Sequence, residues 1–232
     1  MQIHLTLESR SGKRPLAFTF NRMINAGYVG KNQDEVRRHI EELAAKGIPG
    51  PESIPVLFPV VCSALTTDPA IDVYGSETAG EVEYVLCVNA ASEVYVGLGS
   101  DHTDRHLEKS DIPRSKQICP NIMSRTVWPL EEVEADWDAL LMRADVVKDG
   151  RTVHYQEGRL GLLLNPAELM EFVQRNLKGP FEQLIIFSGT MGMLTGDFVF
   201  GESFAAELVD EAGGRRLALN YDVHPMTYLE NT

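Results

Sequence analysis

The sequence has 232 residues, of which 44% are hydrophobic, so it can bury one sizeable core and is not the composition of a disordered chain. It carries 21 Lys and Arg against 34 Asp and Glu, and the resulting net charge of −13 argues against nucleic acid or a membrane surface as partner. The sequence shows no signal segment and no apolar run long enough for a membrane span, and its three cysteines form no C-x-x-C pair. We therefore expect a cytoplasmic protein with reduced thiols.

Apolar periodicity and turn residues predict a β-rich chain with a few helices. The expected elements, in chain order, are a hairpin from residues 2–7 and 16–20, a helix over 34–46, a hairpin from 81–88 and 93–98, a polar irregular segment over 100–125, a hairpin from 141–148 and 152–156, a helix from 166 to about 177, and β-runs at 198–200, 205–209 and 217–221. Asp149-Gly150 is typical of a two-residue hairpin turn, and Asn165-Pro166 of a capped helix start. The sequence contains no repeat and no linker, so we expect a single α+β domain that is mostly β.

Glu81 and Glu83 lie two residues apart in a predicted strand, which places both carboxylates on the same face, roughly 6.5–7 Å apart. A solvated strand face is the usual origin of such a pair, but residues 84–88 are mostly apolar and indicate a buried strand. Paired carboxylates in a buried strand need a metal ion or a proton between them. The pair therefore predicts a cation site.

A third carboxylate lies in the polar segment 99–108, directly after an apolar strand. Asp101 would complete a set of three oxygen ligands, which suits hard cations such as Mg²⁺, Mn²⁺ or Ca²⁺ better than zinc. The same segment offers His102, Asp104 and His106 as an alternative zinc site, because two imidazoles and a carboxylate can hold that ion. A polar surface turn is the third interpretation.

His39 and Glu42 lie three residues apart on the predicted helix, so their side chains are neighbours. A carboxylate beside an imidazole raises its basicity and fixes its tautomer, as in a general base. A solvated helix face has the same spacing, so the pair alone leaves both interpretations open.

Taken together, these segments resemble, in family order, the sequence blocks of the fumarylacetoacetate hydrolase superfamily, and are nearest to an uncharacterised bacterial branch of it. The resemblance covers about residues 28–223. Two departures are three extra residues between Asn32 and His39, and Gly201-Glu202-Ser203 in place of the final Thr-Gly-Thr. The matching segments are Gly30-Lys31-Asn32 with His39 and Glu42, Pro55-Val56-Leu57-Phe58, Glu81-Val82-Glu83, residues 100–108, Lys116 with Pro120, Val147-Lys148-Asp149-Gly150 with Gln156, and residues 194–203.

The resemblance implies a mixed β-sandwich or β-roll with a few peripheral helices, in which residues 1–27 are an N-terminal hairpin extension and residues 28–223 form the catalytic region. It also implies a homodimer and a bound Mg²⁺ or Mn²⁺, with Ca²⁺ as a further possibility. The roles that it assigns are Glu81, Glu83 and Asp101 for the metal, His39, Glu42 and Lys116 for catalysis, and Arg105, Gln156 and Ser203 for substrate binding.

The activity implied by the resemblance is C–C bond hydrolysis in a small 2-oxo acid or 1,3-dicarbonyl substrate, such as an acylpyruvate, with the metal stabilising an enolate. A decarboxylase, hydratase or isomerase of 2-oxo acids would use the same enolate chemistry. A different class of protein also fits, namely a non-catalytic metabolite-binding protein that keeps the metal site. In each case the expected partner is a small carboxylate.

Overall fold

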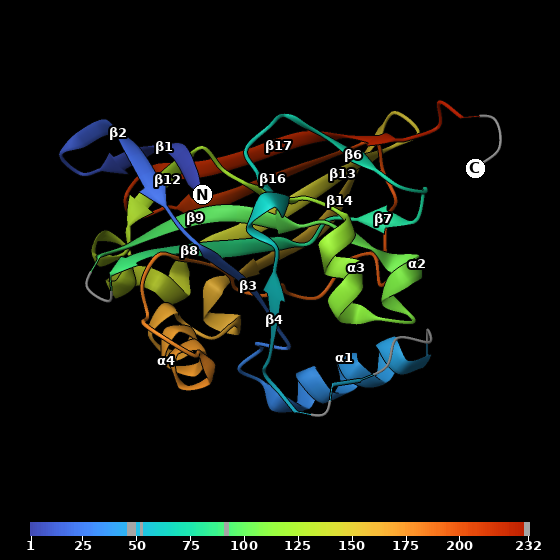
Figure 1. Ribbon diagram of the computed structural model, residues 1–232, viewed down its shortest axis with the longest axis horizontal. Coiled ribbons are helices and arrows are strands. Elements are labelled where there is room, and N and C mark those ends of the chain that lie inside the picture. Colours follow the sequence, from blue (N-terminus) through green and yellow to red (C-terminus); the bar gives the residue numbers. More distant parts are fainter. Residues whose placement is uncertain (46–49, 52, 91–92, 230–232) are drawn as a thin grey trace.

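The computed structural model describes the chain except residues 46–49, 52, 91–92 and 230–232, and in helix α1 it gives the backbone but not the side chains of residues 33, 35, 39, 42, 43 and 45. The fold is built on two mixed β-sheets with helices at their periphery (Figure 1). This confirms the expected α+β class with a predominance of strands.

The larger sheet has ten strands in the described part of the chain, in the order β2-β1-β12-β9-β8-β15-β3-β4, with β11 paired to β9 and to β5. Its central hairpin, β8 with β9, is the one that the sequence predicts around residues 89–92. The bounds of these strands are β1 (Gln2–Ser9), β2 (Gly12–Thr19), β3 (Arg22–Gly27), β4 (Val56–Val60), β5 (Leu65–Thr66), β8 (Val82–Ala90), β9 (Glu93–Asp101), β11 (Asn121–Met123), β12 (Thr126–Pro129) and β15 (Leu184–Phe187).

The smaller sheet has five strands among the described residues, in the order β14-β13-β16-β17-β6. The hairpin of β13 and β14 turns at Asp149 and Gly150, whose φ angles of 52° and 68° are those of a type I′ turn, as predicted. The bounds are β6 (Ala70–Val73), β13 (Leu141–Lys148), β14 (Arg151–Arg159), β16 (Ser203–Asp210) and β17 (Arg215–Pro225), and a separate two-stranded ladder joins β7 (Thr78–Ala79) to β10 (Thr103–Asp104).

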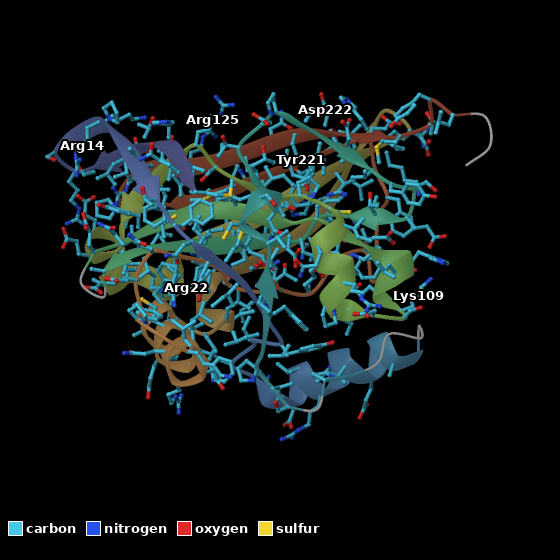
Figure 2. The ribbon with its side chains drawn as sticks, viewed as in Figure 1. Arg14, Arg22, Lys109, Arg125, Tyr221 and Asp222 are labelled. Atoms are coloured by element: carbon cyan, nitrogen blue, oxygen red, sulfur yellow. The ribbon has the colours of Figure 1, made fainter. Side chains whose placement is uncertain are left out.

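Strand β8 is buried on both faces, which explains its nearly continuous apolar sequence. Tyr84 and Leu86 on one face pack in a cluster that includes side chains of both sheets. Val85 and Cys87 on the other face pack in a second cluster, which the N-terminal strands cover with Phe18 and other residues. In Figure 2 the side chains fill the space between the layers.

Four α-helices and four 3-10 helices lie outside the sheets in the described residues. Helix α4 begins as the sequence predicts, because Asn165 and Glu168 form a reciprocal capping box in front of Pro166. Among the described residues, no helix is long and apolar enough to cross a membrane. The bounds are α1 (Gln33–Ala45), α2 (Arg105–Glu108), α3 (Ile112–Ile118), α4 (Pro166–Asn176), η1 (Cys62–Ala64), η2 (Leu130–Glu132), η3 (Glu134–Ala139) and η4 (Leu160–Leu162).

Three sequence-based expectations differ from the structure. The segment 100–125, expected to be irregular, contains β10, α2, α3 and β11. The expected β-run at 198–200 is not a strand, whereas the short apolar run 184–187 forms β15, which was not expected. Strand β15 pairs with β8 and with β3, and the long-range pairing with β3 could not be derived from local patterns.

Candidate metal centre

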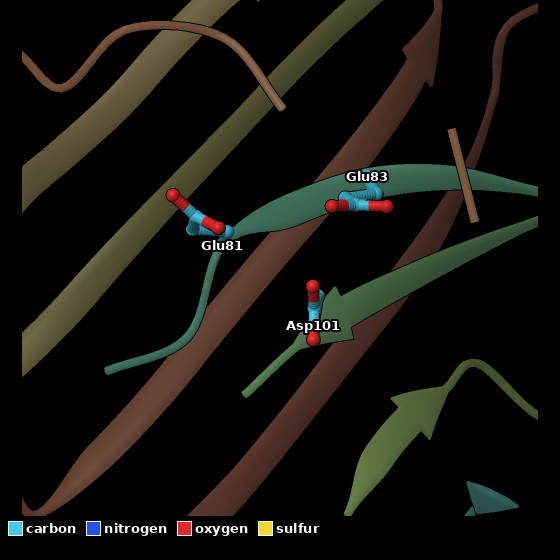
Figure 3. A group of neighbouring side chains, drawn as sticks. All are labelled: Glu81, Glu83 and Asp101. Carbon is cyan, nitrogen blue, oxygen red and sulfur yellow. The ribbon is translucent and has the colours of Figure 1, made fainter. Parts of the chain in front are cut away.

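Strands β8 and β9 bring three carboxylates together. Glu83 lies opposite Gly99, two residues before Asp101. Glu81 directly precedes β8, and its carbonyl oxygen accepts a hydrogen bond from the backbone N–H of Asp101 at 3.1 Å. One carboxylate oxygen from each of the three residues lies within 4.8 Å of the other two. Figure 3 shows the three side chains gathered at the ends of the two strands. The structure thus assembles the three residues that the resemblance assigns to a metal.

Burial makes this assembly unfavourable unless positive charge joins it. Glu83 and Asp101 are each 1% exposed. The backbone N–H of Gly189 donates to Glu83 Oε2 at 2.8 Å, but burial and the neighbouring Asp101 carboxylate still raise the pKa of Glu83 well above its ordinary value. A cation between the carboxylates would remove the repulsion that contributes to this raised pKa.

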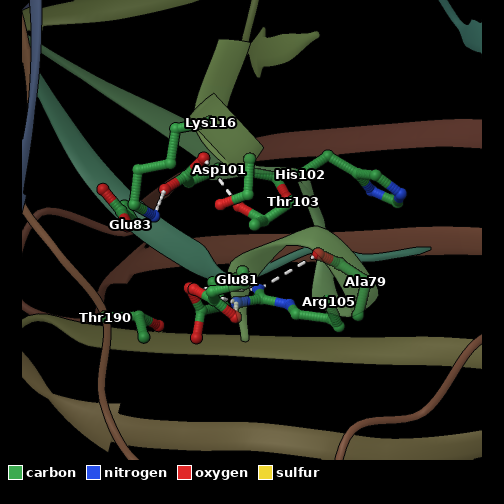
Figure 4. Close-up of polar contacts among 12 residues, drawn as sticks. Ala79, Glu81, Glu83, Asp101, His102, Thr103, Arg105, Lys116 and Thr190 are labelled. Atoms are coloured by element: carbon green, nitrogen blue, oxygen red, sulfur yellow. Dashed lines mark hydrogen bonds and ion pairs between the residues drawn. The ribbon is translucent and has the colours of Figure 1, made fainter. Parts of the chain in front are cut away.

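Lys116, in the last turn of α3, donates from Nζ to Asp101 Oδ2 (Figure 4). Burial lowers the pKa of this ammonium, but the carboxylates of Asp101 and Glu81 outweigh burial and raise the pKa above its ordinary value. For Asp101, burial raises the pKa, yet the Lys116 ammonium holds it below the ordinary value. Lys116 and Asp101 are therefore both charged at neutral pH.

Both terminal nitrogens of the Arg105 guanidinium bond to protein groups. Its Nη2 donates to the carbonyl oxygen of Ala79 and pairs with Glu81 Oε2, both at 3.1 Å, and its Nη1 donates to Glu108 Oε2 at 2.9 Å. Its guanidinium lies 4.3 Å from the ring centroid of Phe198. Arg105 is only 2% exposed, and its two terminal nitrogens are paired, whereas its Nε has no hydrogen-bond partner among the described residues. Its role toward a substrate stays a prediction.

The charges of these groups fit a divalent cation. With all four carboxylates ionised, which is the state that a bound cation favours, the centre has two positive and four negative charges and a net charge of −2. Oxygen-only ligand sets favour hard divalent ions, so the residues present fit Mg²⁺ or Mn²⁺. The charges counted are those of the cations Lys116 and Arg105 and of the carboxylates Glu81, Glu83, Asp101 and Glu108.

The alternative zinc set does not assemble in the structure. The two ring nitrogens of His102 lie 2.9 Å from Tyr221 Oη and 3.0 Å from Thr78 Oγ1, and burial lowers the pKa of this imidazole to about 3. Asp104 caps helix α2, and the His106 side chain is 81% exposed. Among the described residues, the triad at Glu81 is the one group suited to hold a metal ion.

The triad lies at a cavity of about 330 Å³ that helix α1 partly covers. Glu81, Glu83 and Lys116 form its charged wall, and residues 32, 36 and 38 line it from α1 and its start. The side chains of His39 and Glu42, the predicted catalytic pair, lie outside the described part of the chain. Their helix nevertheless borders the cavity, which is the place that the sequence-based hypothesis requires.

None of the three residues predicted to bind substrate, Arg105, Gln156 and Ser203, is among those that line the cavity. Gln156 is 0% exposed, and its carboxamide accepts from Val82 N and donates to Thr190 Oγ1 and to the carbonyl oxygen of Met191. It therefore acts as a brace for the cavity wall. Ser203 begins β16, where it pairs with strands of the smaller sheet.

Sequence reasoning missed the loop that follows β15. Gly189 and Thr190 line the cavity, with Thr190 Oγ1 donating to the carbonyl oxygen of Val82 at 2.7 Å. Gly189 has φ +83°, and a Cβ there would lie 2.9 Å from the carbonyl oxygen of Ala26, so only glycine lets its N–H reach Glu83. The signal was Ser188-Gly189-Thr190 directly after the apolar run 184–187, which matches a Thr-Gly-Thr turn better than residues 201–203 do.

The raised pKa of Glu83 predicts how the metal-free protein responds to pH. A carboxyl whose folded-state pKa lies above its unfolded value stabilises the fold below the unfolded pKa and loses that contribution as pH rises through the folded-state pKa. In chelator at about pH 7.5, Glu83→Gln should therefore have a higher melting temperature than wild type. Each kcal/mol gained in the free energy of unfolding raises the melting temperature by roughly 2–4 °C. The difference should shrink toward about pH 4.5, where the wild-type side chain is also neutral.

Differential scanning fluorimetry at several pH values measures this difference. Glu182→Gln, at an exposed position, is the matched control and should melt like wild type at every pH. If Glu83→Gln melts below wild type near neutral pH, the carboxylate is not under the electrostatic stress described here.

Comparison with solved structures shows where this fold occurs. The structure of Cg1458 with an inhibitor matches with a TM-score of 0.65 and 17% identity over 93% of this chain and 81% of that one. 2-Keto-3-deoxy-D-arabinonate dehydratase with magnesium and 2,5-dioxopentanoate matches with a TM-score of 0.64 and 15% identity over 92% and 76%. A fumarylacetoacetate hydrolase family protein from Yersinia pestis CO92 matches with a TM-score of 0.62 and 15% identity over 94% and 99%.

The chain thus has the fold of the fumarylacetoacetate hydrolase family, as the sequence resemblance predicted. Residues 26–221 match the model of the family described as protein of unknown function DUF2848, and the chain belongs to that family. Comparison with proteins of curated function gives no match.

Proposed function

We propose that this protein is a divalent-metal-dependent enzyme that hydrolyses a C–C bond in a small 2-oxo acid or 1,3-dicarbonyl compound, such as an acylpyruvate. The observation that carries the proposal is the convergence of three carboxylates, two of which, Glu81 and Glu83, line a cavity of about 330 Å³. A cavity of this size suits a small metabolite. The fold, shared with an Mg²⁺-bound dehydratase of a keto acid, supports the same substrate class.

Glu81, Glu83 and Asp101 would hold Mg²⁺ or Mn²⁺, and Ca²⁺ would accept the same oxygens. When bound, the cation polarises the substrate carbonyl and stabilises the negative charge that develops on its oxygen. Lys116 lines the cavity and keeps a fixed positive charge beside that oxygen. The Gln156 carboxamide donates to Thr190 Oγ1 and keeps this residue in the cavity wall.

The general base is proposed to come from α1. Glu42 orients the His39 imidazole, which takes a proton from water. The hydroxide adds to the acyl carbon, the C–C bond breaks, and its electron pair passes to the 2-oxo acid fragment as an enolate. A proton returned to that carbon completes the products, a carboxylic acid and a 2-oxo acid, so all atoms of water and substrate are accounted for.

A lyase acting on a 2-oxo acid is the second candidate, because one structural neighbour is a keto-acid dehydratase complexed with magnesium. A panel of acylpyruvates, oxaloacetate and 3-deoxy-2-keto sugar acids, each incubated with protein and Mn²⁺, separates the two. Release of pyruvate together with a carboxylic acid supports hydrolysis, whereas CO₂ release or water loss supports the lyase. A protein that binds pyruvate or oxalate with Mn²⁺ but turns over nothing would be a metabolite-binding protein. Homodimer formation and a cytoplasmic location stay predictions from the sequence.

His39→Ala tests the role of α1. We expect turnover of the identified substrate to fall at least about a hundredfold, because general-base catalysis contributes on that order. Mn²⁺ affinity, measured by calorimetry, should stay within about twofold of wild type, because the triad is untouched. Arg37→Ala, on the same helix and exposed, is the matched control and should keep full activity. Full activity of His39→Ala would mean that the base lies elsewhere.

A further inference from the structure

Two carboxamides near the metal centre lack a protein partner. Asn25 on β3 and Asn121 on β11 are both 0% exposed. In the described part of the chain, no hydrogen-bond partner lies in bonding geometry with the side-chain nitrogen or oxygen of either residue. An unpaired buried polar group costs roughly 1–3 kcal/mol, and native proteins rarely bear that cost twice in one place without a function.

Strand alternation places both carboxamides on one face of the larger sheet. In β3, Ile24 and Ala26 pack into the cluster shared by the two sheets, so Asn25 points to the opposite face. In β11, Ile122 packs into that same shared cluster, so Asn121 also points to the opposite face.

The metal ligands Glu83 and Asp101 share this face. Glu83 lies between Val82 and Tyr84, which both pack in the cluster between the sheets. Asp101 is the direct register partner of Asn121 across β9 and β11, and side chains at paired positions point to the same face. The Asn25 side chain lies within hydrogen-bonding reach of the Asp101 carboxylate, although not in strict bonding geometry. Both asparagines are therefore neighbours of one carboxylate.

The Asp101 carboxylate needs hydrogen-bond donors that keep its orientation when a cation is bound. Thr103 Oγ1 donates to its Oδ1 at 3.2 Å, and the Lys116 ammonium holds its Oδ2. An ammonium repels any divalent cation that binds the same carboxylate, so it is a poor anchor in the metal-bound state. An amide N–H orients a carboxylate without adding charge, which is how the outer partners of metal ligands commonly act.

We propose that Asn25 and Asn121 are positioning residues of the metal centre, whose carboxamides orient Asp101 toward Glu81 and Glu83, directly or through an ordered water. This inference rests on the proposed metal-dependent function. It explains why two amides are kept in an otherwise apolar layer beside Val85 and Phe187. Neither asparagine is among the residues that line the cavity, so neither is expected to touch substrate.

Asn25→Leu and Asn121→Leu test the proposal, because leucine has the same number and branching of side-chain heavy atoms as asparagine and no hydrogen-bonding group. Mn²⁺ titration by calorimetry should show Kd raised about 10- to 100-fold in each variant. The melting temperature in chelator should be unchanged or higher, because an unpaired polar group has been removed. A residue with only a structural role would change the melting temperature and leave Kd alone.

Ser124→Ala is the matched control, since Ser124 is buried in the same sheet and bonds Leu98 and Thr126 but no carboxylate. It should melt lower than wild type and bind Mn²⁺ equally well. Equal Kd in wild type and both leucine variants overturns the inference, whereas no Mn²⁺ binding by wild type overturns the proposed function itself. If a leucine variant does not fold, Asn25→Ser and Asn121→Ser decide by the same Kd comparison.

Discussion

Mg²⁺ or Mn²⁺ added to chelator-treated protein should raise its melting temperature by roughly 5–10 °C at a hundredfold excess over Kd. A ligand that binds only the folded state stabilises it by RT ln(1 + [L]/Kd), which is about 2.7 kcal/mol at that excess. In a domain of this length each kcal/mol corresponds to about 2–4 °C. The effect is large because the ion neutralises carboxylates that otherwise repel one another in a buried site.

The same experiment gives its own controls. Glu83→Gln keeps the shape of the triad but loses a charge, so its melting temperature should no longer respond to the ion. Glu171→Gln, whose side chain is 69% exposed, should respond like wild type. The wild-type shift should also shrink below about pH 5, where protons compete for the same oxygens. A melting temperature that neither ion changes at neutral pH would contradict both the metal centre and the proposed enzyme.

Lys116→Met should lower turnover about 10²- to 10³-fold, because it removes the fixed charge beside the developing oxyanion. The same variant should bind Mn²⁺ more tightly than wild type, by about tenfold, since no ammonium then shares Asp101 with the ion. In chelator it should melt lower, because Asp101 is left buried without its partner, at a cost of about 3–5 kcal/mol. Turnover and metal affinity therefore change in opposite directions.

Calorimetry with Mn²⁺, a melt in chelator and a turnover assay measure these three effects. Lys109→Met is the matched control, since the Lys109 side chain is 46% exposed and lies outside the cavity lining, and it should behave like wild type. Weaker Mn²⁺ binding by Lys116→Met would show that the ammonium supports the metal instead of competing with it.

The triad could be predicted from sequence because its geometry is local. Glu81 and Glu83 share a strand face by alternation, and the apolar residues after them indicate that the strand is buried. Asp101 follows the partner strand of the same hairpin, so a short turn alone brings it near. The capped start of α4 is equally local, and it too was predicted correctly.

The rest of the site depends on long-range contacts. Gly189 reaches Glu83 because β15 pairs with β8, across a separation of 106 positions between the two residues. A four-residue apolar run gives no periodicity from which to predict that strand. Helices α2 and α3 are short and polar, and their starts depend on the caps Asp104 and Asp111, which also occur in loops. Local patterns therefore could not place Lys116 in a helix.

The charge of −2 at the triad has a consequence for how metal and substrate share the protein. An anionic metabolite is repelled by the uncompensated carboxylates, so its affinity rises when the cation is present. By thermodynamic reciprocity, the metabolite raises the affinity for the cation by the same factor. In the enzyme that we propose, the fraction of protein loaded with metal would then depend on metabolite supply as well as on the free ion concentration, and it would fall when the metabolite is scarce.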